Sequence, residues 1–169
     1  KPEFDDAKLF EIFILETMQA GLSWSTILRK RENMRKAFDK FDYKIIAQYD
    51  DEKKKSLLED EGIIRNRLKI DALISNAKAF MKIQEEYGSF SKYIWKFTED
   101  KPIVNKWESI SQVPAKTEIS DKMSKELKKK GFKFAGSTIC YAFMQATGMV
   151  NDHMIWCDEY KKSLKAKKS

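Results

Sequence analysis

Apolar residues recur at intervals of three and four along most of the chain, which is the spacing of one face of an α-helix. The clearest pattern predicts a helix over about residues 66–86, with one continuous apolar stripe along its surface. The other expected helices cover residues 5–20, 23–38, a short stretch around 45–46, 51–61, 90–97, 120–130 and 137–147. Only 6 glycines and 3 prolines interrupt 169 residues. We therefore predict an all-α fold.

Residues that favour helix ends stand at the borders of these patterns. The expected N-caps are Asp5 or Asp6, Ser23 or Ser25, and Ser120, and the expected helix-terminating glycines are Gly21, Gly62 and Gly131. Residues 98–114 hold two of the three prolines, so a linker or long loop is expected there. We predict a single unit over residues 1–169, with a division into two lobes near 98–118 as one arrangement, and a basic tail at 161–169.

Composition excludes several classes of protein. No run of about 18 apolar residues occurs, so no membrane span is expected. The two cysteines, Cys140 and Cys157, cannot build a disulfide framework, which favours a reducing cytoplasm. A single histidine, His153, excludes a multi-histidine metal cluster. No exposed apolar stripe calls for a partner subunit, so a monomer is expected.

The charge balance favours a polyanionic partner. The formal net charge is +7 and the pI is near 9.2, which puts nucleic acid first among the candidates. Charge alone is weak evidence, because many basic proteins bind no nucleic acid.

Glu16 interrupts the apolar stripe of the first expected helix. It stands four residues after Ile12 and three after Phe13, so it shares their face. A carboxylate that faces a core needs a compensating partner, and such groups concentrate at functional sites. Two interpretations stay open: an edge residue that reaches water or an arginine, or the binding group for a cationic ligand. Trp24, just beyond the helix end, suits stacking on a flat, electron-poor ring, although most tryptophans are core residues.

A lysine-rich turn joins the two expected helices near residues 127–138. Gly131 and Gly136 bound the turn, Lys133 lies within it, and Ser137 and Thr138 open the second helix. Free backbone N–H groups at that N-terminus, together with the helix dipole, suit a DNA phosphate. An ordinary helical hairpin with a solvated lysine face is the other interpretation.

His153 and Cys157 lie four residues apart, so on a helix they would share one face. Imidazole and thiolate suit zinc, but zinc takes four ligands, and no third cysteine or second histidine lies nearby. From the spacing alone, a partly buried histidine beside a small apolar cysteine is the simpler interpretation. Cys140 is expected in the core.

Several stretches together resemble one known family. They run from Lys8–Glu11 to Gln19–Trp24, then Gly62–Arg65, Gly131–Phe134 with Gly136, and Val150–His153 leading to Cys157. In this order they cover nearly the whole chain, and they resemble bacterial 3-methyladenine DNA glycosylase I of the helix-hairpin-helix superfamily. The resemblance implies a helix-hairpin-helix glycosylase fold. It also implies a bacterial, cytoplasmic enzyme that acts on double-stranded alkylated DNA.

The resemblance also implies roles for individual residues. Glu16 would contact the methylated base, and Trp24 would stack on it. Gln19, Gly21 and Leu22 would face the DNA and help fill the gap left by the flipped nucleotide. The phosphate-binding hairpin would comprise Lys133, Gly136, Ser137 and Thr138, and the metal ligands would be His153 and Cys157.

In the family, two further zinc ligands and some pocket aromatics precede the position of Lys1. A structural zinc is therefore expected in the intact family member, and its presence in this chain stays open. The first residue is Lys1 rather than Met, so we expect a segment to be missing upstream.

The function expected from this resemblance is hydrolysis of the N-glycosidic bond of 3-methyladenine by a monofunctional glycosylase, with the free base as product. No motif positions a lysine for Schiff-base chemistry. Asp152 is expected to hold His153 or a backbone N–H rather than to act as a catalytic aspartate. The alternatives are a non-catalytic helix-hairpin-helix DNA-binding module and a helical protein-interaction domain.

Overall fold

A computed structural model describes residues 2–106 and 112–152. Its helices are α1 (Asp6–Gln19), α2 (Trp24–Ala37), α3 (Tyr43–Ile46), α4 (Asp51–Glu59), α5 (Arg67–Tyr87), α6 (Phe90–Trp95), α7 (Glu118–Lys129) and α8 (Ser137–Ala146). Two short 3-10 turns lie at Asp39–Phe41 and Lys96–Thr98, and two short strands are β1 (Ile103–Val104) and β2 (Val150–Asn151). The mostly helical architecture confirms the predicted fold class. Among the described residues, no helix is both long enough and apolar enough to cross a membrane.

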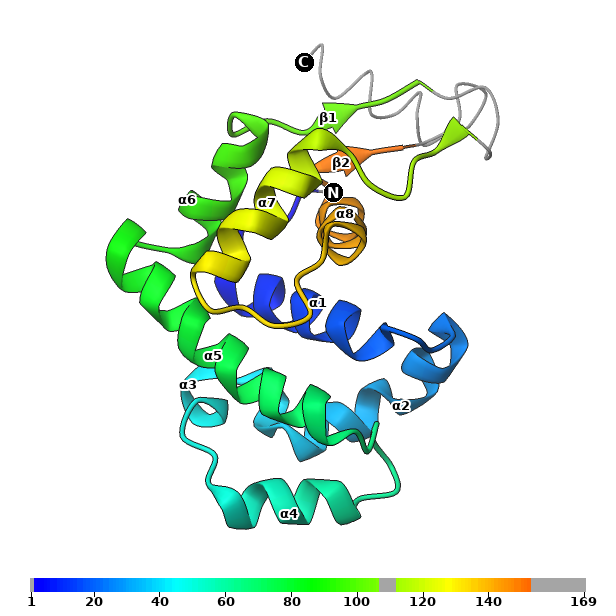
Figure 1. The fold of residues 1–169 in the computed structure, drawn as a ribbon, viewed down its shortest axis with the longest axis vertical. Helices are drawn as coiled ribbons and strands as arrows, with labels where there is room; N and C mark the ends of the chain where they lie inside the picture. The colour runs from blue at the N-terminus through cyan, green and yellow to red at the C-terminus, as the bar shows by residue number, and fades with distance from the viewer. Residues whose placement is uncertain (1, 107–111, 153–169) are drawn as a thin grey trace.

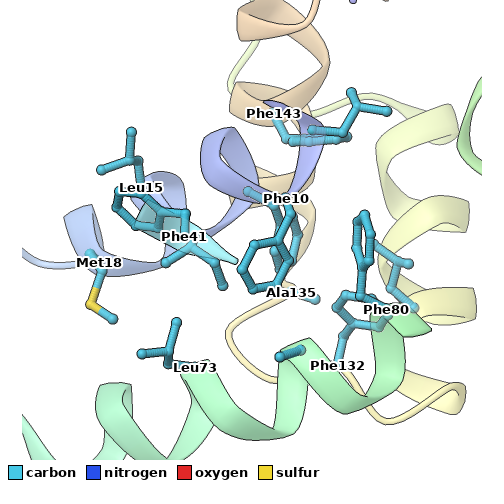
Figure 2. Close-up of a cluster of buried hydrophobic side chains, with 14 of the residues drawn as sticks. Phe10, Leu15, Met18, Phe41, Leu73, Phe80, Phe132, Ala135 and Phe143 are labelled. Atoms are coloured by element: carbon cyan, nitrogen blue, oxygen red, sulfur yellow. The ribbon is translucent and has the colours of Figure 1, made fainter. Parts of the chain in front are cut away.

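Helix α1 lies at the centre of the molecule, between α5 on one side and α8 on the other (Figure 1). Seven of the ten residues 9–18 are apolar, the exceptions being Glu11, Glu16 and Thr17, and most of the ten are buried. Phe13 packs edge-to-face against Phe132 and Phe143, with ring centroids 5.4 and 5.6 Å apart. Phe10 meets Phe80 of α5 at 5.2 Å in the same way. One aromatic core therefore joins α1, α5, α8 and the turn before α8, as Figure 2 shows.

Asp6 has a different role from the expected N-cap of α1. Its carboxylate accepts hydrogen bonds from the backbone N–H groups of Phe90 and Ser91, at 2.9 and 2.8 Å, and from the side chain of Gln84 at 2.9 Å. Asp5 occupies the N-cap position of α1 without a side-chain cap bond. The predicted position of the N-cap at Asp5 is therefore confirmed, although neither Asp5 nor Asp6 caps α1 through its side chain. Asp6 instead satisfies the free N–H groups at the start of α6, 84 and 85 residues away.

Helices α7 and α8 form a helical hairpin. Thr117 is the N-cap of α7 and Ser120 completes a capping box with it, so the prediction of Ser120 as the cap was wrong by three residues. Gly131 ends the approach to the turn with φ +97°, a left-handed conformation that suits glycine. Phe134 also has positive φ, at 55°, within the same turn.

The segment predicted as a loop at 98–114 contains strand β1. It pairs in parallel with β2, with Ile103 opposite Val150 and Val104 opposite Asn151. Two residues are too few to produce an alternating pattern, so the sequence carried no signal for this strand. The division into two lobes near 98–118 stays a prediction.

Candidate base-recognition and DNA-binding site

Glu16 lies in the buried part of α1, one turn before the helix ends. Its exposed fraction is 7 %, which confirms that it faces inward on the apolar stripe. Within the described part of the chain, its carboxylate takes part in no hydrogen bond or ion pair. The interpretation of Glu16 as an edge residue paired with an arginine therefore does not hold for these residues. Burial raises the pKa of Glu16 from its usual 4.5 to about 6. A buried carboxylate of this kind is ready to accept a cationic or hydrogen-bond-donating ligand.

The chain turns a sharp corner at the end of α1, three residues after Glu16. Helix α1 ends at Gln19, whose carbonyl accepts from the N–H of Leu22 at 2.7 Å. Gly21 has φ +80° at the tip of the turn, where a residue with a side chain would be strained. We call residues 19–24 the corner, because they join α1 to α2 there (Figure 1).

The corner presents two apolar side chains to solvent. Leu22 is 39 % exposed, and Trp24, the first residue of α2, is 44 % exposed. Ser23 caps α2, its hydroxyl accepting from the N–H of Thr26 at 3.3 Å. The exposure of Trp24 excludes the alternative interpretation that it is a core residue. An exposed aromatic ring and an exposed leucine therefore follow, within eight residues along the chain, a buried carboxylate that has no partner in residues 2–106 and 112–152.

Lys69 of α5 supports the corner from behind. Its ammonium group donates to the carbonyl oxygens of Met18 and Ala20, at 2.7 and 2.6 Å. The side chain is only 5 % exposed, and burial lowers the pKa of Lys69. These two carbonyls belong to the last turn and C-cap of α1, which lack partners within the helix.

The hairpin turn before α8 was the second predicted site. We call residues 131–136 the hairpin turn; Gly136 is the N-cap of α8 and offers no side chain to the free N–H groups of the first turn. A Cβ at Gly136 would meet nothing within 4 Å, so this end of the helix is open. Lys133 and Thr138 are exposed, and Gly136 and Ser137 are half-buried. The helix end predicted for phosphate binding is therefore accessible.

Ser137 already has hydrogen-bond partners in this structure. Its hydroxyl lies 2.5 Å from Asp121 of α7, to which it donates, and 2.8 Å from the hydroxyl of Ser120. Asp121 brings a negative charge close to the helix end that the sequence predicts for an anion.

Asn76 is a functional candidate that the sequence interpretation missed. It is fully buried on α5, and its amide pairs with both backbone groups of Lys133. Its nitrogen donates to the carbonyl at 3.1 Å, and its oxygen accepts from the N–H at 2.7 Å. Asn76 lies three residues after Leu73 and four before Phe80, so it interrupts an apolar stripe as Glu16 does. The test that selects Glu16 would have found it.

The predicted metal ligands cannot be placed, because His153 and Cys157 lie outside the described residues. In residues 2–106 and 112–152, no group of three His, Cys, Asp or Glu side chains could hold a metal ion. Asp152 accepts from the hydroxyl of Tyr141 and from the amides of Asn105 and Gln145, at 2.6 and 3.0 Å for the amides. Cys140 is buried, as expected for a core residue.

Comparison with known proteins identifies the family. The family model described as methyladenine glycosylase matches residues 1–160. DNA-3-methyladenine glycosylase 1 of Escherichia coli is 48 % identical over 156 residues, which is 92 % of this chain and 83 % of that protein. The DNA-3-methyladenine glycosylase of Haemophilus influenzae is 49 % identical over 157 residues, covering 93 % and 85 % of the two chains.

Solved structures agree with the sequence matches. The structure that describes 3-methyladenine recognition by 3-methyladenine DNA glycosylase I from Staphylococcus aureus superposes with a TM-score of 0.91. It is 34 % identical, and the match covers 95 % of this chain and 85 % of that one. By its sequence along nearly its whole length and by its fold, this chain belongs to the methyladenine glycosylase family.

Proposed function

We propose that this chain is a DNA-3-methyladenine glycosylase of base-excision repair, which hydrolyses the N-glycosidic bond of 3-methyladenine in alkylated double-stranded DNA. One observation carries the proposal: Glu16 is a buried carboxylate without a partner among the described residues, beside the exposed corner. The relatives that bear this activity in their names support it. We expect a monomer that acts in the bacterial cytoplasm.

Glu16 supplies the charge that complements the lesion. Methylation at N3 makes adenine cationic and weakens its bond to the sugar, and the base leaves as a neutral molecule. Strong acid catalysis is therefore unnecessary. Above pH 6 the carboxylate is mostly ionised, since its pKa is about 6. It can then attract the cationic base and accept hydrogen bonds from its exocyclic amine.

The corner provides the surfaces that a flipped nucleotide requires. Trp24 would stack on the extruded base, because its ring is exposed and begins the helix next to the corner. Gln19, Gly21 and Leu22 would enter the duplex and fill the gap, which offsets part of the cost of unstacking.

The hairpin turn would hold the DNA backbone without choosing a sequence. Lys133 contributes charge, and Gly136, Ser137 and Thr138 place the free N–H groups of α8 against a phosphate. Phosphate binding at the hairpin turn would orient the duplex while residues of the corner insert into it.

Water completes the reaction by attacking the cation-like sugar, which leaves an abasic site. Lys69 is a buried lysine that contacts the corner. Its ammonium group already donates hydrogen bonds to the carbonyls of Met18 and Ala20. It is therefore not a free amine for Schiff-base formation, which favours a monofunctional hydrolase over a lyase.

A structural zinc is the expected metal, with His153 and Cys157 as two of its ligands; its role would be to stabilise the fold, and no catalytic step depends on it. The test is the zinc content of the purified protein by inductively coupled plasma mass spectrometry. Zinc bound by the unmodified chain and lost in His153→Ala and Cys157→Ser would assign both ligands. Zinc bound equally by all three proteins would exclude them, and zinc-free unmodified protein would show that the ligands which the family places before the position of Lys1 are required.

The function is tested by mass-spectrometric detection of free 3-methyladenine released from methylated duplex DNA. The intact chain should release the base, and Glu16→Gln should reduce release far more than DNA binding. Glu11→Gln on the same helix is the matched control, because the carboxylate of Glu11 is already paired with Arg31 and Arg35 and has no proposed contact with the base. No release, with salt-sensitive DNA binding intact, would favour the non-catalytic DNA-binding module.

A further inference from the structure

We infer that α5 is a spacer that sets the distance between the corner and the hairpin turn, and that Lys69 and Asn76 are its positioning residues. This inference rests on the proposed function, in which these two segments contact DNA. The two residues are seven apart on α5, so they lie on nearly the same face, about 10 Å apart along the helix axis.

Lys69 fixes where the chain leaves α1. Its ammonium group binds the carbonyls of Met18 and Ala20, which are 51 and 49 residues away in sequence. No carboxylate pairs with it among the described residues, so these carbonyls and the negative end of the α1 dipole are what compensate the buried charge. A lysine held this way constrains the backbone that leads into Gly21 and Leu22.

Asn76 fixes the hairpin turn by binding one residue at both of its backbone groups. The two bonds to Lys133, at 2.7 and 3.1 Å, set the orientation of that peptide as a neighbouring strand would. The next residue, Phe134, has φ 55°, which a residue with a side chain rarely adopts. The fully buried amide of Asn76 binds the residue directly before Phe134 and is therefore well placed to hold this conformation.

Further contacts hold the hairpin against α5. A Cβ at Gly131 would lie 3.9 Å from the Cβ of Ala79, so the turn passes close to the helix surface. Lys130 reaches Glu86 at 3.4 Å and lies 5.0 Å from the ring centroid of Tyr87. The end of α7 and the hairpin turn thus contact α5 over more than two helical turns, and Figure 1 shows the turn between α7 and α8 beside this helix.

In this arrangement α5 fixes the distance between the two segments that are proposed to contact DNA. The corner and the hairpin turn are more than 100 residues apart in sequence, and each is bound through its backbone to one continuous 21-residue helix. A phosphate gripped at the hairpin turn would therefore lie at a constant distance from the base opened by the corner, without readjustment during flipping.

The test separates the two ends of the spacer. Lys69→Met should lower the single-turnover rate of base release at saturating DNA about tenfold, with the Kd for duplex DNA within about threefold. Asn76→Leu should weaken the Kd about tenfold, with the rate at saturation within about threefold. Lys69→Arg, which can donate to two carbonyls, should restore most of the rate.

Two matched variants control for the loss of a hydrogen-bonded side chain. Lys30→Met removes a lysine that also binds two carbonyls, those of Glu61 and Ile63, at 3.4 and 3.2 Å. Gln84→Met removes an amide of α5 that binds Asp6 and Tyr43. Both controls should leave the rate and the Kd within about twofold of the original values.

Amide hydrogen exchange gives a readout that does not depend on activity. Exchange at Leu22 should accelerate in Lys69→Met, and exchange at Lys133 should accelerate in Asn76→Leu, each without an effect at the other segment. Should either variant fail to fold, Lys69→Gln and Asn76→Asp, which retain part of the hydrogen bonding, replace it in the same measurements.

The outcomes distinguish the inference from the proposed function. If the unmodified chain releases no base, the proposed function fails, while the exchange data still decide whether α5 holds both segments. If the unmodified chain is active and Lys69→Met behaves like Lys30→Met, or Asn76→Leu like Gln84→Met, the spacer is refuted. Parallel loss of rate and affinity in both variants would also refute it, because that pattern indicates general destabilisation.

Discussion

Glu16→Gln should stabilise the protein at neutral and alkaline pH while it impairs base release. In the native state the pKa of Glu16 is about 6, against a usual value of 4.5, and the cause is burial. Between these two values the folded protein binds more protons at this group than the unfolded chain does. The free energy of unfolding therefore falls as the pH rises from 4.5 through 6, and the ionised carboxylate continues to cost stability above that window.

The magnitude follows from the two pKa values. At about 1.4 kcal/mol for each tenfold change in the ionisation constant, the buried charge costs about 2 kcal/mol at pH 8 and under about 1 kcal/mol at pH 5. Glutamine has the same shape and no charge, so Glu16→Gln recovers up to these amounts. For a chain of this length, the gain at pH 8 corresponds to a rise in Tm of about 4–8 °C.

Urea denaturation followed by circular dichroism at pH 5 and pH 8 measures this gain directly. Glu11→Gln is the control on the same helix, and it should give no gain because it breaks ion pairs of 3.4 and 2.6 Å with Arg31 and Arg35. A Glu16→Gln protein no more stable than the original at pH 8 would refute the reasoning. So would a gain of equal size at both pH values, since that would not come from the carboxylate charge.

Further predictions concern the reaction and the DNA grip. The rate of base release at subsaturating DNA should fall about tenfold from pH 7 to pH 5, because Glu16 with a pKa of about 6 becomes protonated, and Glu16→Gln should show no such step. Trp24→Ala should weaken binding of free 3-methyladenine at least about fivefold by calorimetry, yet shift the Tm by under about 2 °C since the ring is 44 % exposed; unchanged binding would contradict stacking. Asp121→Asn should tighten DNA binding about threefold at low salt by removing a negative charge beside Ser137, and an effect that persists at high salt would argue against this electrostatic cause.

The sequence predicts the parts of this molecule that depend on local periodicity. Helix α5 was expected at 66–86 and extends over Arg67–Tyr87, because its apolar residues repeat at helical spacing over five turns. Glu16 was recognisable for the same reason, since one charged residue on an apolar stripe needs no knowledge of the fold.

The remaining features depend on contacts between distant segments. Asp6 caps α6 from more than 80 residues away, and Asn76 binds Lys133 across 57 residues. Neither pairing has a local signature, because a buried polar side chain reveals only that it needs a partner. The exposure of Trp24 depends on how α2 leaves the corner, which is set by tertiary packing rather than by the composition of either helix.

The parallel pairing of β1 with β2 makes the hairpin part of a closed loop. The N–H of Ile103 donates to Met149 at 2.8 Å and that of Asn105 to Asn151 at 2.9 Å, so the chain returns at residue 150 beside the place it left at 104. Because the two ends of the segment that contains α7 and α8 are held side by side, the ladder limits the conformational freedom which this segment would gain on local unfolding. It therefore stabilises the phosphate-binding helix pair in addition to the contacts that the pair makes with α1 and α5.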